Sequence, residues 1–406
     1  MTKIEHKIAA VLDRLTTNPW TAFPIFILIV YALFWCTFSL GKYPMDWISS
    51  GVGLLGGWIN AAFAHTPQLE WLRNLLVDGV LAGVGGVLAF LPNIFILYLL
   101  LSIMESTGYM GRVAYLMDSL MHHMGLHGKS FIPMIMGFGC NVPAIMATKD
   151  IHPRKSRVVT ALIIPFMSCS GRLPVYLLVV AAFFPKHGPI VLLGIYALGV
   201  ILAVVSAKVL SLVIPGISAH DTVGIKPYSH PDMHYVLDNA WSQVKEYLKK
   251  LSGPILVFSV ALWLLGYFPR PEQGHETTPS QQMEQSFIGH VGKAMEPVLE
   301  PIGMNWKDGV AIVSGVGAKE LIVSTMGVMY SDDGLNLQQG LARHHTPAGA
   351  LALIVFVLLY FPCVGTFVAL KHVLQSWPLV IASAVNSIII AWIMAFAVFR
   401  VASSFL

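Results

Sequence analysis

The sequence predicts an all-α polytopic membrane protein with roughly eight hydrophobic units, several of them re-entrant or discontinuous helices. Of its 406 residues, 56% are hydrophobic and only 11% are charged, and the mean hydropathy is +0.70. Soluble domains carry about 25% charged residues, so this composition is typical of a chain that lies largely in lipid. Glycine, proline and cysteine also interrupt several apolar stretches that would otherwise be simple spanning helices.

The N-terminal elements begin with a polar stretch. Residues 1–17 lack the apolar core of a signal peptide, which predicts a cytoplasmic lead-in. Residues 20–40 are the cleanest expected span, because about 20 apolar residues cross a bilayer. Residues 75–105 are too long for one such helix and contain a glycine-rich run and Pro92, which predicts a re-entrant half-helix before a full helix. Residues 113–124 are amphipathic and are expected at the interface.

The rest of the first half contains two broken segments. Residues 131–148 are interrupted around Cys140, and the basic residues at 149–157 that follow predict a cytoplasmic loop. A span at 158–184 is interrupted at 165–174, and residues 188–214 return to the same side.

The second half follows a polar segment whose end, 235–250, is expected to form a surface helix. The later elements are, in order, a span at 255–268, the longest loop at 269–300, broken segments at 309–330 and 351–371, and a last span at 378–401. The expected division is a lead-in at 1–17, a first half at 18–214, a polar cytoplasmic segment at 215–250 and a second half at 251–406.

The broken segments are the candidate transport site, because an unpaired backbone group in hydrocarbon survives only where protein or a cavity surrounds it. A faint internal repeat relates two of them and predicts two pseudo-symmetric halves whose breaks meet. It aligns Gly137, Gly139 and Asn141 with Gly315, Gly317 and Lys319. The alternative is that the two Gly-x-Gly pairs arose by chance in a glycine-rich membrane chain.

The first break offers ligands for a cation. The half-helix before it ends with open carbonyls, which attract positive charge, and Pro143 suits the first turn of the next half-helix. The Cys140 thiol and Asn141 amide add sulfur and oxygen, and Cys169 adds a second sulfur from the next break. Thiolates select softer metals over magnesium or calcium, so a divalent transition metal fits best.

Each candidate residue also has a structural interpretation. Cysteines in membrane helices are often packing residues, which is the interpretation for Cys36, whereas Cys363 stands at the third break, FPCVGT. Met146 offers a thioether, but Met in apolar helices is far more often filler. Lys319 and Glu320 could neutralise one another's surroundings, or Glu320 could meet a passing cation; the alternative is that they snorkel at the end of a half-helix.

Other charged and titratable residues are expected outside the metal path. Arg172 would repel a cation and is predicted to pair with a carboxylate or with free carbonyls. The histidines fall mostly in predicted loops, as His344 and His345 do, and are expected to be solvated.

Four motifs in order, GKSFIPMIMGFGCNVPAIMATK, PFMSCSGRLPVY, GVGAKELIVSTMG and LLYFPCVGT, closely resemble the membrane domain of the ferrous iron transport protein B (FeoB) family, with its two Gate segments. The likeness runs from about Asn18 to the C-terminus and also includes ESTGYMGRVAYLMD, which contains Glu105. It implies Fe(II) uptake across a prokaryotic cytoplasmic (inner) membrane, with Cys140, Cys169 and Cys363 along the metal path.

The candidate residues divide into two sets. The proposed metal ligands are Cys140, Asn141, Cys169 and Cys363. The proposed pathway and gating residues are Gly137, Gly139, Pro143, Met146, Ser168, Glu105, Lys319 and Glu320.

Two departures from the family pattern affect the expected mechanism. Family members usually begin with a cytoplasmic G domain, and here only 17 residues precede the first span. Gly128-Lys129-Ser130 lacks the earlier glycine of a phosphate-binding loop, because His123 stands at that position. We therefore expect no GTP site and no enzyme in this chain. Either a separately encoded GTPase or a small cytoplasmic accessory protein is the partner, or transport runs down the iron gradient without a GTPase. The family glutamate expected near Val373 is absent.

The sequence is also compatible with other functions. A Gate-type chain fits an organic solute such as a nucleoside, or a non-transporting membrane subunit that docks a GTPase. A membrane enzyme is disfavoured, because Ser168 and Ser170 lack a plausible histidine partner. The formal net charge of +4 gives no sign of a nucleic-acid partner; contact with membrane lipid is expected, and a homo-oligomer stays open.

Overall fold

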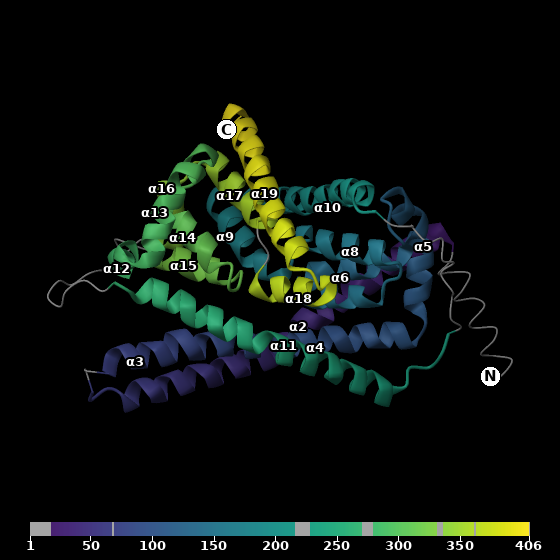
Figure 1. The fold of residues 1–406 in the computed structure, drawn as a ribbon, viewed down its shortest axis with the longest axis horizontal. Helices are drawn as coiled ribbons and strands as arrows, with labels where there is room; N and C mark the ends of the chain where they lie inside the picture. Colours follow the sequence, from purple (N-terminus) through teal and green to yellow (C-terminus); the bar gives the residue numbers. More distant parts are fainter. Residues whose placement is uncertain are drawn as a thin grey trace.

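A computed structural model describes residues 18–66, 69–215, 228–269, 279–330, 336–360 and 363–405, and within these ranges the chain is helical without any β-strand (Figure 1). Seven helical segments of the described chain are long and apolar enough to cross a membrane. The prediction of an all-α polytopic membrane protein is confirmed. The predicted lead-in at 1–17 lies outside the described residues.

The helices of the first half are α2 (Pro19–Ala62), α3 (Glu70–Asn74), the π-helix η2 (Leu75–Leu81), α4 (Ala82–Ser106), α5 (Tyr109–His123), η3 (Gly128–Ser130), α6 (Phe131–Gly139), α7 (Asn141–Ala147), η4 (Thr148–Asp150), α8 (Arg154–Ile163), η5 (Ile164–Phe166), η6 (Ser170–Arg172), α9 (Leu173–Phe183) and α10 (Gly188–Val213). Those of the second half are α11 (Met233–Tyr267), α12 (Pro279–Gln285), α13 (Phe287–Leu299), η7 (Glu300–Ile302), α14 (Trp306–Ser314), α15 (Leu321–Tyr330), α16 (Leu337–His344), α17 (Pro347–Leu359), α18 (Val364–Leu374) and α19 (Trp377–Phe405).

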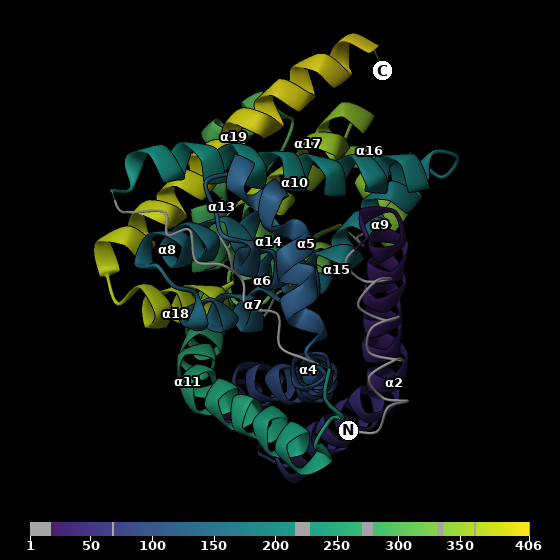
Figure 2. The ribbon, with the colours of Figure 1, turned by 90° about the vertical axis from the view of Figure 1, so that its right-hand side faces the viewer.

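Three long helices form one side of the molecule, where α4 packs along both α2 and α11. The broken helices α6, α7, α14 and α15 lie between this side and α10, which crosses the opposite side (Figure 2). The short helices are therefore enclosed by protein, which is the only setting in which interrupted backbone is tolerated at membrane depth.

Helix α2 is longer than the predicted span at 20–40. It begins where the Asn18 side chain accepts a hydrogen bond from the Trp20 backbone, with Pro19 in the first turn. Its 44 residues correspond to about 66 Å, roughly twice the hydrocarbon thickness of a bilayer. The helix therefore extends beyond the hydrocarbon or lies strongly tilted in it.

The predicted re-entrant half-helix within 75–105 was wrong, because η2 and α4 form one continuous helical segment. Two glycines of this run allow close packing of helices instead of a break. A Cβ added to Gly83 would collide with Ser259 of α11, and one added to Gly85 would lie 2.6 Å from Val52 of α2. Small residues at such contacts let membrane helices approach closely.

The polar run at 235–250 is the first half of α11 and no separate surface helix, so the boundary drawn at 250 falls inside a helix of 35 residues. Asp232 caps its start by accepting hydrogen bonds from His234 N and Tyr235 N. The predicted long loop at 269–300 was also wrong, because α12 and α13 occupy most of its described part. Likewise Arg154 begins α8, so the predicted basic loop is short.

All four predicted interruptions are present. They fall between α6 and α7, between α8 and α9, between α14 and α15, and between α17 and α18. Phe361 and Pro362 of the last one lie outside the described residues.

His345 is buried, so the prediction that it is solvated was wrong. Its Nε2 lies 3.2 Å from Asp308 Oδ1, and the two side chains are 1% and 0% exposed. Tyr330 joins them, since its hydroxyl lies 2.8 Å from the same carboxylate oxygen. Burial opposes charge on the imidazole, but Asp308 outweighs it and raises the pKa of His345 above its ordinary value.

The His345 contact should make stability depend on pH. A raised pKa in the folded state means that the stabilisation is fully present below the unfolded value of about 6.5 and is lost as the pH rises through the folded pKa. We expect His345→Gln to destabilise the detergent-solubilised protein by about 2 kcal/mol near pH 6 and by less in alkaline buffer. Thermal unfolding measured across pH tests this, with the exposed neighbour His344→Gln as control. A pH-independent loss would contradict the ion pair.

Candidate transport site

A cavity of about 710 Å³ lies where the interruptions meet the long helices α2, α4 and α11. Most of its wall is apolar. Its reactive or charged lining residues in the described chain are Cys140, Cys169, Cys363, Lys319, Glu320 and Asp78. Residues more than 200 positions apart in the sequence therefore face one space.

At the first interruption the chain leaves helical geometry for one residue. Cys140 is extended, with φ −152° and ψ 129°, between the end of α6 at Gly139 and the start of α7 at Asn141. Ser170 of the second interruption donates a hydrogen bond of 2.8 Å to the Gly139 carbonyl. The buried Asn141 Oδ1 has no hydrogen-bond partner within the described ranges, but Asn141, unlike its neighbour Cys140, is not among the residues that line the cavity.

The second interruption is held by Arg172, which is fully buried. Its Nη1 donates to the carbonyls of Pro165 at 3.0 Å and Met167 at 3.1 Å. These carbonyls belong to the segment between α8 and α9, where the helical bonding pattern is lost. Arg172 thus pairs with free carbonyls, one of the two roles predicted for it.

The third and fourth interruptions are tied to each other. Val364 N, at the start of α18, donates a hydrogen bond of 2.8 Å to the carbonyl of Val316 in the segment between α14 and α15. A Cβ built on Gly171 would lie 3.4 Å from Glu320 Oε2, so this carboxylate reaches the second interruption. The four breaks form one connected structure.

Lys319 does not snorkel to the surface, because it is 4% exposed. Its Nζ lies 3.2 Å from the centre of the Tyr360 ring, a cation–π contact. The Tyr360 hydroxyl is anchored in turn on the Ile312 carbonyl. The ammonium group is therefore held by an aromatic face at the cavity wall.

The structure brings only some of the predicted residues to the cavity. Those lining it are Gly139, Cys140, Cys169, Cys363, Lys319 and Glu320. Of the others, Gly137 packs against Met167, Ser168 donates to Tyr176, and Pro143 is buried in α7.

Met146 and Glu105 lie elsewhere. Met146 lines a separate small pocket, and Glu105 is exposed at the end of α4. Sequence reasoning missed Asp78 of η2, although a lone carboxylate inside the apolar stretch 75–105 was the signal that pointed to it.

The thiols share a cavity without forming a closed metal site. In the part of the chain that the structure describes, no group of three or more His, Cys, Asp or Glu side chains lies close enough to hold a metal ion. A closed tetrahedral thiolate site holds its metal firmly. Separated sulfur and oxygen donors along one cavity would bind a metal ion less firmly than such a closed site.

Comparison with known proteins agrees with this architecture. The family model of the Gate domain, described as nucleoside recognition, matches residues 87–183 and 248–377, more than half of the chain. The Fe(2+) transport protein A/Fe(2+) transporter FeoB fusion protein of Porphyromonas gingivalis is 42% identical over 96% of this chain and 51% of its own length. No solved structure matches the chain significantly.

Two further relatives carry the name Fe(2+) transporter FeoB. The protein of Campylobacter jejuni is 41% identical over 89% of this chain and 60% of its own length, and that of Staphylococcus aureus is 36% identical over 97% and 59%. The chain spans about half to three fifths of the length of these relatives.

Paired broken helices that face one cavity inside an all-α bundle define a Gate-type membrane protein. The chain belongs to the FeoB family, to whose longer members it is similar over nearly its whole length.

Removing the Arg172 guanidinium should destabilise the protein, because the Pro165 and Met167 carbonyls would lose their buried donor. We expect Arg172→Met to cost about 2 to 4 kcal/mol in unfolding by detergent or heat. The exposed Arg154→Met is the control and should cost little. Equal stability of the two variants would show that Arg172 does not hold the interruption.

The three cavity thiols should be reachable by small water-soluble reagents. In single-cysteine variants we expect Cys140, Cys169 and Cys363 to react with a methanethiosulfonate about tenfold faster than Cys36, which does not line the cavity. The rate of labelling, followed by mass spectrometry, measures this. Labelling of Cys36 at the same rate would argue against a water-filled cavity.

Proposed function

We propose that this chain conducts Fe(II) across a prokaryotic cytoplasmic membrane, through the cavity lined by the broken helices. The observation that carries the proposal is the convergence of Cys140, Cys169 and Cys363 on one cavity. Sulfur donors favour transition metals over magnesium and calcium. The names of the Porphyromonas, Campylobacter and Staphylococcus relatives support iron(II) as the metal.

The mechanism follows from the donors around the cavity. Fe(II) exchanges its water step by step for the Cys140 thiol and the Asn141 amide oxygen, and passes to Cys169 and Cys363 as the half-helices move. The Glu320 carboxylate offsets the positive charge of the ion. Lys319, whose Nζ lies over the Tyr360 ring, places a basic group at the wall, and its protonated form lowers the affinity of the cavity for a second ion.

Accessory partners belong to this proposal. The Porphyromonas relative joins a protein named Fe(2+) transport protein A to its transporter, which supports a small accessory protein as partner. The Gly128-Lys129-Ser130 string is unsuited to hold a phosphate, because Gly128 N donates to Asp118 and Lys129 N to His127. Any GTP-driven step would therefore use residues other than these.

A second candidate function is transport of a nucleoside-like solute. The matched family is described as nucleoside recognition, and the cavity volume of about 710 Å³ falls in the range of small-molecule sites. Competition between Fe(II) and uridine for uptake separates the two functions, because a metal path through thiols is not blocked by a nucleoside.

Fe(II) flux should depend on the cavity cysteines. We expect Cys140→Ser with Cys169→Ser to lower the initial rate of Fe(II) uptake into proteoliposomes by about tenfold or more, because a neutral hydroxyl binds Fe(II) far more weakly than a thiolate. Iron is kept reduced, and uptake is read with an internal chelator dye. Cys36→Ser is the matched control. Unchanged flux in the double variant would remove these thiols from the path.

A further inference from the structure

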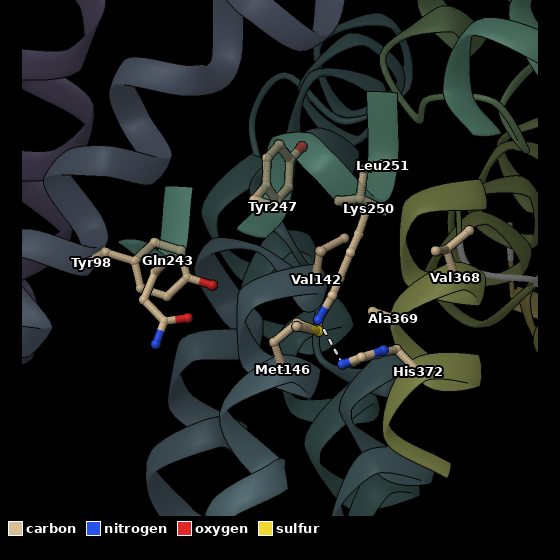
Figure 3. Close-up of a pocket in the computed structure, with 10 residues that line it drawn as sticks. All are labelled: Tyr98, Val142, Met146, Gln243, Tyr247, Lys250, Leu251, Val368, Ala369 and His372. Carbon is tan, nitrogen blue, oxygen red and sulfur yellow. Dashed lines mark hydrogen bonds between the residues drawn. The ribbon is translucent and has the colours of Figure 1, made fainter. Parts of the chain in front are cut away.

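A second, smaller pocket lies beside the main cavity and shares a wall with it. Val142 and Tyr247 line both spaces. The small pocket is bounded by α7, α11 and α18, and its polar lining includes Lys250 and His372 (Figure 3). Its free volume is only about 10 Å³, so it is closed to anything larger than a water molecule.

Two of the helices around the small pocket, α7 and α18, each begin at a cysteine interruption. Lys149, after α7, stands nine residues beyond Cys140, and His372, on α18, stands nine residues beyond Cys363. Nine residues of helix rise about 13 Å, which is roughly the distance from each cysteine to the basic residue beyond it. Both half-helices therefore run from the thiols toward one polar cluster.

That cluster consists of Glu246, Lys250, His372 and Lys149. The Lys250 ammonium is hydrogen-bonded to Glu246 and lies 2.6 Å from His372 Nε2. Lys149 Nζ lies 3.9 Å from the other oxygen of Glu246. The cluster adjoins the basic residues at 149–157, which the distribution of positive charge assigns to the cytoplasmic side.

The hydrogen bond to Lys250 defines the tautomer of His372. An ammonium group has donors only, so His372 Nε2 must accept and the imidazole proton is on Nδ1. A carboxylate oxygen and a neutral imidazole nitrogen thus face one cation. These are the donor types that bind divalent iron, and Met146 adds a thioether to the pocket wall.

We infer that Glu246 and His372 form an exit site for the transported divalent metal, which the tethered ammonium of Lys250 fills while the path is closed. The inference rests on the proposed function, since the exit site receives the ion from the cysteine cavity. When Lys250 swings away, the two ligands take the ion, and water completes its coordination. Two protein ligands suit a site of passage, because few bonds must break for release.

The test uses Co(II) as a probe on the purified full chain in nanodiscs under reducing conditions. We expect Lys250→Gln to bind one additional Co(II), or to bind it about tenfold more tightly than the unaltered chain, in equilibrium dialysis. Lys249→Gln removes the same charge from the adjacent exposed residue and should change nothing. Adding Glu246→Gln or His372→Gln to Lys250→Gln should abolish the gain.

The outcomes separate the exit site from the proposed function. The absorption band of thiolate bound to Co(II) reports the cysteine cavity, whereas the dialysis gain reports the exit site. A thiolate band without any gain in Lys250→Gln overturns the exit site alone. A gain without a thiolate band supports the exit site and contradicts the cysteine path. Should Lys250→Gln fail to fold, Lys250→Met serves in its place, and equal binding by that variant and Lys249→Gln overturns the inference.

Discussion

The structure depends on one constraint, which is that backbone groups freed from helices in hydrocarbon must find partners inside the protein. Freed backbone groups here are satisfied either within their own interruption or by a neighbouring one. Arg172 donates to the carbonyls of its own segment, Ser170 to Gly139, and Val364 to Val316. The first interruption is thus tied to the second and the third to the fourth, and moving a half-helix at these contacts costs a hydrogen bond to its neighbour.

The same constraint bears on the proposed transport path. A half-helix has one end at the cavity and the other near the surface, so a small rotation changes both together. In this chain α7 and α18 both connect a cysteine interruption to the cluster around Glu246. Under the proposed function, these two short helices would link the thiols to the polar cluster along the path of the ion.

Glycine and proline residues did not by themselves predict where a helix is interrupted. Around Cys140 they mark a real interruption, whereas Gly83, Gly85 and Pro92 lie inside a continuous helical segment. The difference is in the neighbours. Gly83 and Gly85 fit against Ser259 and Val52, where a side chain would collide, so the residues serve packing between helices. Local composition cannot distinguish these uses, because both require a missing side chain.

The sequence by itself determined the membrane class, because composition reports the surrounding solvent. It also predicted the four interruptions from the Gly, Pro and Cys around residues such as Cys140 and Cys363, but the same pattern wrongly predicted a break within 75–105. Only the tertiary structure decided which interruptions face one cavity, that Lys319 lies under Tyr360, and that Asp78 joins the lining while Glu105 does not. It also decided that His345 is buried against Asp308. These facts depend on packing between segments far apart in the chain, which no local pattern of residues records.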